Sequence, residues 1–563
     1  MATVITSPTM KRFSDQYFSV AAKCRERTLK NGDRIGECAA CRLTESSTAA
    51  WVLVALAAAF VSTCGIAQSL PAEVLRAAPP TPVTAWRFTP EISVTESYTD
   101  NAALVSSATA QNSWVTETTP GIRIEKGGVR SRLYLDYRLH DFRYSRDSRL
   151  NNSQRLLASY ATVEAVDNWL FVDASANITQ QNRSAFNIAA ATDTSGPNGN
   201  RAETATKQIS PYVRGRLADI ATYQLRAVGT DIRSDDVALP DTKARQWNGF
   251  IKNQRATAGF GWSVDGNALS FRNKTVGKLH DERVRGLISF EIDPQLHVSA
   301  IAGHEVTNFA GVQNDRATTS GFGLEWSPSA RTQFAAVKEK RFFGDSHSVS
   351  LSHRTALTAW KISSNRDLDA LSGQLTSTGA GSTAGLLADL LASAIPDPIA
   401  REAAVRQKLE ASGIPAGSAL SGGFATGRAY LSRRDEASVI LLGTNDTVTL
   451  TLSRRDQRGF GPIVGAADSF SLSNDIRQQG VNLNWSHRLS MYSSLSLIAT
   501  SLRSEGLSVT TLDTRQRSLN LLFSTRIGLH TYMTFGARHV HVDNSLNTSY
   551  RENAVLGSVS LRY

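Results

Sequence analysis

From Trp86 onward, apolar and polar side chains alternate in one segment after another, and few folds accommodate that pattern over so long a chain. The alternation is clearest in segments 133–140, 348–352, 447–452 and 481–486. Successive side chains of a β-strand point to opposite sides, so each segment has one apolar and one polar face. Segments of roughly 10–15 residues with this period are typical of strands that cross a membrane. The pattern predicts an all-β fold, a transmembrane antiparallel β-barrel.

The connections between these segments alternate between short and long. Glycine, asparagine and aspartate favour tight reversals, and they predict turns at 127–128, 167–168, 265–267, 293–294 and 443–446. Longer polar loops are expected at 182–203, 234–245 and 459–469. Short periplasmic turns and longer external loops are typical of outer-membrane barrels. Counting segments gives about 22 strands, with an error of about four. A soluble sandwich or propeller is the alternative, but no blade-like motif is present.

The start of the chain carries a secretion signal. Residues 49–67 form a long apolar stretch ending Gly65-Ile66-Ala67, with small residues where signal peptidase needs them. We predict a leader and signal at 1–67, a periplasmic linker at 68–85 and the barrel at 86–563, in the outer membrane of a Gram-negative bacterium. A retained single-span anchor is the alternative. All four cysteines lie in the leader, so the predicted mature chain has neither a disulfide nor a thiol nucleophile.

Residues 365–427 interrupt the alternation and form a partly helical insertion. Leu386, Leu387, Leu390 and Leu391 share one face of a helix predicted over 384–394. Asp397-Pro398 is an N-cap followed by proline at the first helical position, which predicts a second helix to about residue 412. Strand parity places the insertion outside the cell unless it folds back into the lumen. A plug and a self-packed external hairpin both stay open.

The chain is basic, with a net charge of +11, and its arginines are spread along the strands. Such a distribution favours an arginine-lined lumen for anionic solutes over a nucleic-acid partner. The sequence LSRRD occurs at 431–435 and again at 452–456. The candidate lumenal basic residues are therefore Arg433, Arg434, Arg454 and Arg455. They could form a basic ring for acidic polysaccharide, with the aspartates orienting them; paired charges in a solvated interior or rim are the alternative.

No motif of a hydrolase, metalloprotease or nucleotide-binding enzyme is present. We therefore expect no enzyme, no catalytic residues and no cofactor. His539, His541 and Asp543 share one face of a predicted strand, which is a candidate metal triad. The favoured interpretation is a polar row facing the lumen, with Val540 and Val542 turned to lipid, and no metal.

The last strand, 555–563, reads VLGSVSLRY, and Gly557, Val559, Leu561 and Tyr563 share one face. It resembles the C-terminal targeting strand of bacterial outer-membrane β-barrels. That resemblance implies that these four residues form a barrel-assembly signal, read by the assembly machinery before the strand closes the barrel in lipid. An ordinary amphipathic strand is the alternative.

Two further segments carry a more specific resemblance. Residues 86–101 read WRFTPEISVTESYTDN, and residues 113–124 read SWVTETTPGIRI. Together with IPDP at 395–398 followed by Arg401-Glu402, they resemble the PEP-CTERM system-associated outer-membrane protein family. Membership implies a barrel encoded beside exopolysaccharide synthesis and exosortase genes. It also implies a role in polysaccharide export or envelope assembly with export proteins as partners. The alternatives are a general diffusion porin and a non-conducting structural or surface barrel.

Overall fold

The computed structural model describes most of the chain from residue 85 onward. The described residues are 85–187, 200–236, 239–253, 259–274, 277–309, 315–369, 383–391, 401, 404–405, 407–409, 423–460, 468–508, 512–546 and 549–563. They belong to one compact unit, 70–563, and residues 1–69 form another. The predicted leader, its cleavage site and, apart from residue 85, the predicted linker lie outside the described residues.

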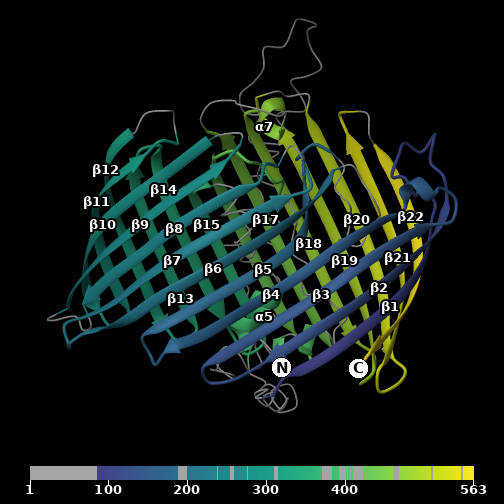
Figure 1. Cartoon of the computed structure of the whole chain (residues 1–563), viewed down its shortest axis with the longest axis horizontal. Helices are drawn as coiled ribbons and strands as arrows, with labels where there is room; N and C mark the ends of the chain where they lie inside the picture. Colours follow the sequence, from purple (N-terminus) through teal and green to yellow (C-terminus); the bar gives the residue numbers. More distant parts are fainter. Residues whose placement is uncertain are drawn as a thin grey trace, which may run out of the picture. The chain divides into compact units, whose positions relative to one another are not determined.

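The described residues form 22 strands, and each pairs antiparallel with its neighbours along the chain. The strands are β1 Arg87–Thr99, β2 Ser113–Lys126, β3 Ser131–Tyr144, β4 Asn152–Val166, β5 Leu170–Asn182, β6 Arg201–Leu217, β7 Ala221–Ser234, β8 Thr242–Asn253, β9 Phe260–Asn273, β10 Gly277–Asp293, β11 Leu296–Thr307, β12 Asp315–Ser329, β13 Thr332–Arg341, β14 Gly344–Arg354, β15 Thr358–Asp369, β16 Tyr430–Leu442, β17 Asp446–Gly459, β18 Asp475–Arg488, β19 Ser493–Gly506, β20 Asp513–Arg526, β21 Thr531–Asn544 and β22 Tyr550–Arg562. Pairing of β1 with β22 closes the sheet (Figure 1). The predicted barrel is confirmed.

The outward face of the barrel is apolar. Large side chains that stay exposed include Val94 on β1, Val284 and Ile288 on β10, Phe322 on β12 and Leu521 on β20. Soluble proteins rarely expose so much apolar surface without covering it. The inward face carries small polar and charged side chains instead. This distribution, on strands of 10 to 17 residues, is that of an outer-membrane barrel.

Short and long connections lie at opposite ends of the barrel. Turns such as 127–130, 167–169, 294–295 and 443–445 join strands at the end where β1 begins and β22 ends. Longer connections such as 100–112, 370–429 and 460–474 join strands at the other end. The turn end is therefore the periplasmic end. The turn predicted at 265–267 is wrong, because these residues lie within β9, and β8 and β9 are joined by 254–259.

The insertion leaves the barrel after Asp369 and returns at Tyr430, two residues that are paired across β15 and β16. It contains helix α5, Thr383–Leu391, close to the predicted 384–394. A short 3-10 helix, η2, spans Ser148–Leu150, and a single-turn helix, α7, spans Ser469–Leu472. Among the described residues, no helix combines the length and apolar character needed to cross a membrane.

Candidate functional site in the barrel lumen

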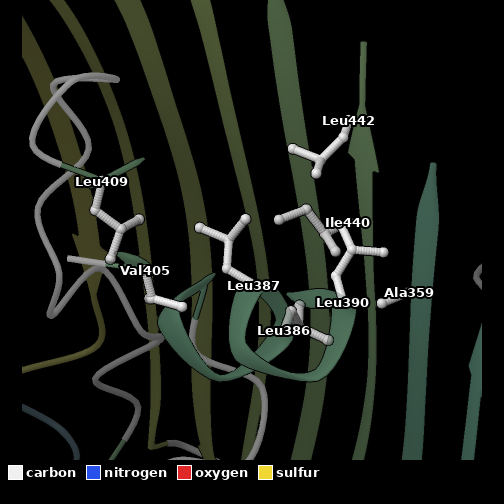
Figure 2. Packing of buried hydrophobic residues seen from close by; sticks show 8 residues of the cluster. All are labelled: Ala359, Leu386, Leu387, Leu390, Val405, Leu409, Ile440 and Leu442. Atoms are coloured by element: carbon white, nitrogen blue, oxygen red, sulfur yellow. The ribbon is translucent and has the colours of Figure 1, made fainter. Parts of the chain in front are cut away.

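Helix α5 packs against the inner wall of the barrel near its periplasmic end. Leu386 and Leu387 are 0% and 1% exposed, and they cluster with Ile440 and Leu442 of β16 and Ala359 of β15 (Figure 2). These wall residues lie in the halves of β15 and β16 next to the periplasmic turns. Helix α5 therefore lies inside the lumen, and the external hairpin is excluded for α5.

The wall that α5 contacts is apolar, unlike the rest of the same strand. Along β16 the inward side chains are Arg434, Glu436 and Ser438, and they then change to Ile440 and Leu442. An apolar patch in a polar lumen would be exposed to water without the helix. Each fully buried leucine contributes about 1.5–3 kcal/mol, so the leucine face of α5 favours docking against this patch.

The second predicted helix is described only in part. Residues 401, 404–405 and 407–409 are helical, and Val405 and Leu409 are buried in the same cluster as Leu386. The predicted start of this helix, Asp397-Pro398, lies outside the described residues. Burial, followed by the nearby Arg488 guanidinium, lowers the pKa of Lys408 below its usual range. A charged lysine in this position opposes docking of the insertion.

Residues 423–429, which we call the mouth strap, cross the extracellular opening of the barrel. The Ala425 amide donates to Asn182 O at the end of β5, at 2.8 Å. Asn273 Nδ2, at the end of β9, donates to Gly427 O at 2.8 Å. The Phe460 amide donates to Ala429 O at 3.1 Å, beside β17. The strap therefore joins strands that are far apart around the barrel.

A buried ion pair and an aromatic cluster hold the mouth strap. Arg428 Nη1 lies 3.3 Å from Asp468 Oδ1, with the two side chains 7% and 9% exposed. Asp468 also accepts a hydrogen bond from Thr426 Oγ1 at 2.9 Å and caps α7. Phe424 of the strap packs edge-on against Phe470 of α7, with ring centroids 5.3 Å apart. We call the Arg428–Asp468 pair the latch. The mouth strap thus spans part of the extracellular opening.

The structure separates the four candidate basic residues into two pairs. Arg434 and Arg455 lie directly opposite each other in the β16–β17 register and point into the lumen. Arg433 and Arg454 point outward, so the expectation of a lumenal side chain fails for them. Arg433 Nε donates to Asp435 at 3.0 Å and Arg454 Nη2 to Asp456 at 2.9 Å. Adjacent residues of a strand cannot face the same side.

The outward pair belongs to a belt of ion pairs around the extracellular rim. Arg477 of β18 contacts both Asp456 of β17, at 2.7 Å, and Glu505 of β19, at 3.5 Å. Arg503 continues it with contacts of 3.1 Å to Glu505 and 3.2 Å to Asp513. The belt lies beyond the apolar band, where lipid headgroups replace hydrocarbon.

The row His539, His541 and Asp543 also faces outward, at the extracellular end of β21. Val540 and Val542 are the inward, fully buried residues, clustered with Leu104 and Tyr550. The expected orientation of this strand is therefore wrong. In the part of the chain that the structure describes, no group of three potential metal ligands is found.

The terminal strand β22 pairs with both β21 and β1. Gly557, Val559 and Leu561 lie on its outward face, and Tyr563 follows the strand with its ring stacked on His530 at 5.3 Å. The role of these residues as an assembly signal stays a prediction.

The lumen holds polar features that the sequence reading missed. Arg341 of β13 is buried and bonds to the fully buried Glu305 and to Asp367. A cavity of about 320 Å³ lies between β1–β3 and β20–β22, with Glu117 and Arg538 in its wall. Charges at two-residue spacing, as in Glu339-Lys340-Arg341, are the signal that could have found such rows.

No protein-family model matches the sequence, and no curated protein matches it in sequence either. The fold is similar to solved transport receptors. The siderophore receptor PirA from Pseudomonas aeruginosa is 11% identical with a TM-score of 0.36, over 85% of this chain and 80% of that one. The FrpB iron transporter from Neisseria meningitidis is 8% identical (TM-score 0.42, 84% and 81%), and the ferric preacinetobactin receptor BauA from Acinetobacter baumannii is 10% identical (0.42, 85% and 81%). Likeness at this level carries no argument about substrate.

Proposed function

We propose that this protein is a gated outer-membrane conduit for exopolysaccharide or related envelope material, in a PEP-CTERM/exosortase-type system. One observation supports the gating: a single insertion occupies the lumen at two places, with α5 on the inner wall near the periplasmic turns and the mouth strap across the extracellular opening. Barrels of about this size enclose a lumen wide enough to need a plug. The polysaccharide part is supported by the sequence resemblance and by the basic lumenal pair Arg434 and Arg455.

The docked insertion argues against a general diffusion porin, because such a porin needs an open lumen at rest. A non-conducting structural barrel is the second candidate. The buried aromatic cluster at the mouth favours it, since Phe186, Phe424 and Phe470 tie three separate connections together. Conductance separates the three functions.

The test is planar-bilayer conductance of the refolded chain from Gln68, the predicted mature start. In the comparison variant, residues 370–429 are replaced by a four-residue turn, which the direct pairing of Asp369 with Tyr430 allows. We expect the full chain to be nearly silent and the variant to conduct steadily, with a preference for anions.

A matched control shortens a loop that does not enter this packing, by deleting residues 106–109 between β1 and β2. It should conduct like the full chain. Large conductance from the full chain would indicate a porin. Silence from both proteins, when heat-modifiable gel migration shows both to be folded, would indicate a structural barrel. Loss of surface exopolysaccharide on deletion of the gene in the host tests the cargo.

A further inference from the structure

Five aromatic side chains face the lumen on one side of the barrel. Tyr134 of β3 lies opposite Tyr160 of β4, and Phe171 of β5 lies opposite Tyr212 of β6. Phe250 of β8 continues the row beyond β7. Tyr134 shares its strand face with Arg138, and Tyr212 shares its face with Gln208; both of these line lumenal cavities. We call these five residues the aromatic track.

Four rings of the aromatic track form two stacked pairs, and two of the five rings are exposed. Tyr134 and Tyr160 have centroids 5.5 Å apart, and Phe171 and Tyr212 have centroids 5.0 Å apart, with planes inclined by 25° and 14°. Tyr160 is 38% exposed and Phe250 37% exposed, although both face the interior of the barrel. Aromatic residues that only fill a core are more completely buried. Tyr160 and Phe250 are therefore accessible from the lumen, whereas Phe171 is buried at 6%.

Cationic groups accompany the rings. The guanidinium of Arg214 lies 4.3 Å from the Phe171 centroid, and that of Arg226 lies 3.9 Å from the Tyr212 centroid. Lys252 Nζ lies 5.8 Å from the Phe250 centroid. Arg226 pairs with Asp173 at 2.8 Å. In the described part of the chain, neither Arg214 nor Lys252 forms an ion pair, so their charges are available to a ligand.

The opposite wall has a different character. Many inward side chains of β17–β19 are short hydroxyls and amides, and these are buried: Thr447, Thr449, Thr451, Asn482, Asn484, Ser486, Ser494 and Ser496. Helix α5 lies on the adjoining strands β15 and β16, about half the barrel away from β5. The aromatic track is thus the wall that α5 does not cover.

We propose that the aromatic track is a binding surface for the sugar rings of an acidic polysaccharide, which names the cargo class and rests on the proposed function. The C–H face of a pyranose ring is apolar and fits against an aromatic face, while its hydroxyls need polar partners. Tyrosine hydroxyls and Asp136 and Asp173 supply those partners. Uronate carboxylates pair with Arg214 and Lys252, the cations that no carboxylate of the described chain occupies.

The experiment is binding of a hexameric oligogalacturonate to the full chain from Gln68 in detergent micelles. Calorimetry gives the affinity, and saturation-transfer NMR gives the ligand protons that touch the protein. We expect saturation of the ring C–H protons. Combining Tyr160→Ala with Phe250→Ala should weaken binding by about tenfold, because it removes two stacking contacts. Tyr160→Phe, which keeps the ring and removes only the hydroxyl, should weaken binding less than Tyr160→Ala.

Tyr137→Ala is the matched control, because Tyr137 lies on the same strand but faces lipid. It should bind like the unmodified chain. Maltohexaose, an uncharged probe, should bind more weakly and be indifferent to Arg214→Gln, which should weaken binding of the acidic probe. The proposal that the aromatic track binds the oligosaccharide is refuted if the unmodified chain does not bind it. It is also refuted if the double alanine variant binds it as tightly as the unmodified chain. A gain of conductance on removal of residues 370–429 would support the gated conduit even if the aromatic track binds no sugar. The two proposals can therefore be refuted independently.

Discussion

The docking of α5 can be perturbed at Leu386, which is fully buried in the contact with the barrel wall. Leu386→Ala removes buried methyl groups and leaves a cavity, at a cost of about 2–5 kcal/mol. The barrel strands do not depend on this contact, so the cost falls on the docked insertion. At about 3 kcal/mol, the ratio of undocked to docked insertion rises by roughly 150-fold.

Ile440→Ala removes the partner side of the same contact. If α5 docks as described, each single substitution raises the open probability in bilayers. The double variant should then show less than the sum of the two effects, with a coupling of about 0.5–3 kcal/mol. Gln407→Ala is the matched control, because Gln407 is exposed on the same insertion.

The assay is single-channel recording, with folding of each variant checked by heat-modifiable gel migration. Additive effects of Leu386→Ala and Ile440→Ala would refute direct packing of the helix on β16. Unchanged open probability in all variants, with the folded barrel intact, would refute the view that this contact closes the lumen.

Three further predictions concern the strap, the second helical segment and the lumenal arginines. Asp468→Ala leaves Arg428 buried without its partner, costs about 3–5 kcal/mol, and should make the strap sensitive to limited proteolysis, whereas a resistant variant would contradict the latch. Burial lowers the pKa of Lys408 in the docked insertion. Between that lowered pKa and the usual lysine pKa, a rise in pH removes the charge of the docked lysine and stabilises docking. Open probability should therefore fall on alkalinisation, and Lys408→Met should abolish the change; the same pH dependence in that variant would exclude Lys408. Arg434→Gln with Arg455→Gln should reduce anion preference in reversal-potential measurements. The same substitutions in the outward pair, Arg433 and Arg454, should leave it unchanged, and equal effects of the two double variants would contradict the assigned faces.

The barrel could be predicted from the sequence because, within the hydrocarbon, the lipid-facing side of each strand must be apolar while the lumenal side can be polar. Leu133, Leu135 and Leu139 alternate with Asp136 and other polar residues for this reason. The leucine spacing in 384–394 likewise predicted the helix and its buried face. The partner of that buried face lies far away in the sequence. The sequence alone therefore could not distinguish a plug in the lumen from a self-packed external hairpin.

Near the rim, strand faces could not be assigned from the pattern. Beyond the hydrocarbon the outward face is charged too, so Arg433 and Arg434 look alike in sequence although they face opposite sides. At β21 the rule is inverted, because loop residue Leu104 covers the interior and makes Val540 and Val542 buried inward residues.

The false turn at 265–267 has a related cause. Turn-forming residue types also serve as lumenal polar side chains. Arg285 Nε donates to Asp265 at 3.0 Å, and Gln246 Nε2 donates to Asn267 at 3.4 Å. Both partners lie on neighbouring strands, so the polar character of the segment is satisfied by the wall and no reversal is needed.

The pairing of Asp369 with Tyr430 has a practical consequence. The cylinder is complete without residues 370–429, since the strands on either side already meet. The insertion can therefore be exchanged as a cassette, leaving the wall sequence untouched. A variant carrying only a tight turn at this place would be a wide, cysteine-free nanopore once the leader is removed. Single thiols placed along its wall could then report, by changes in blockade current, how far a threaded polymer has advanced.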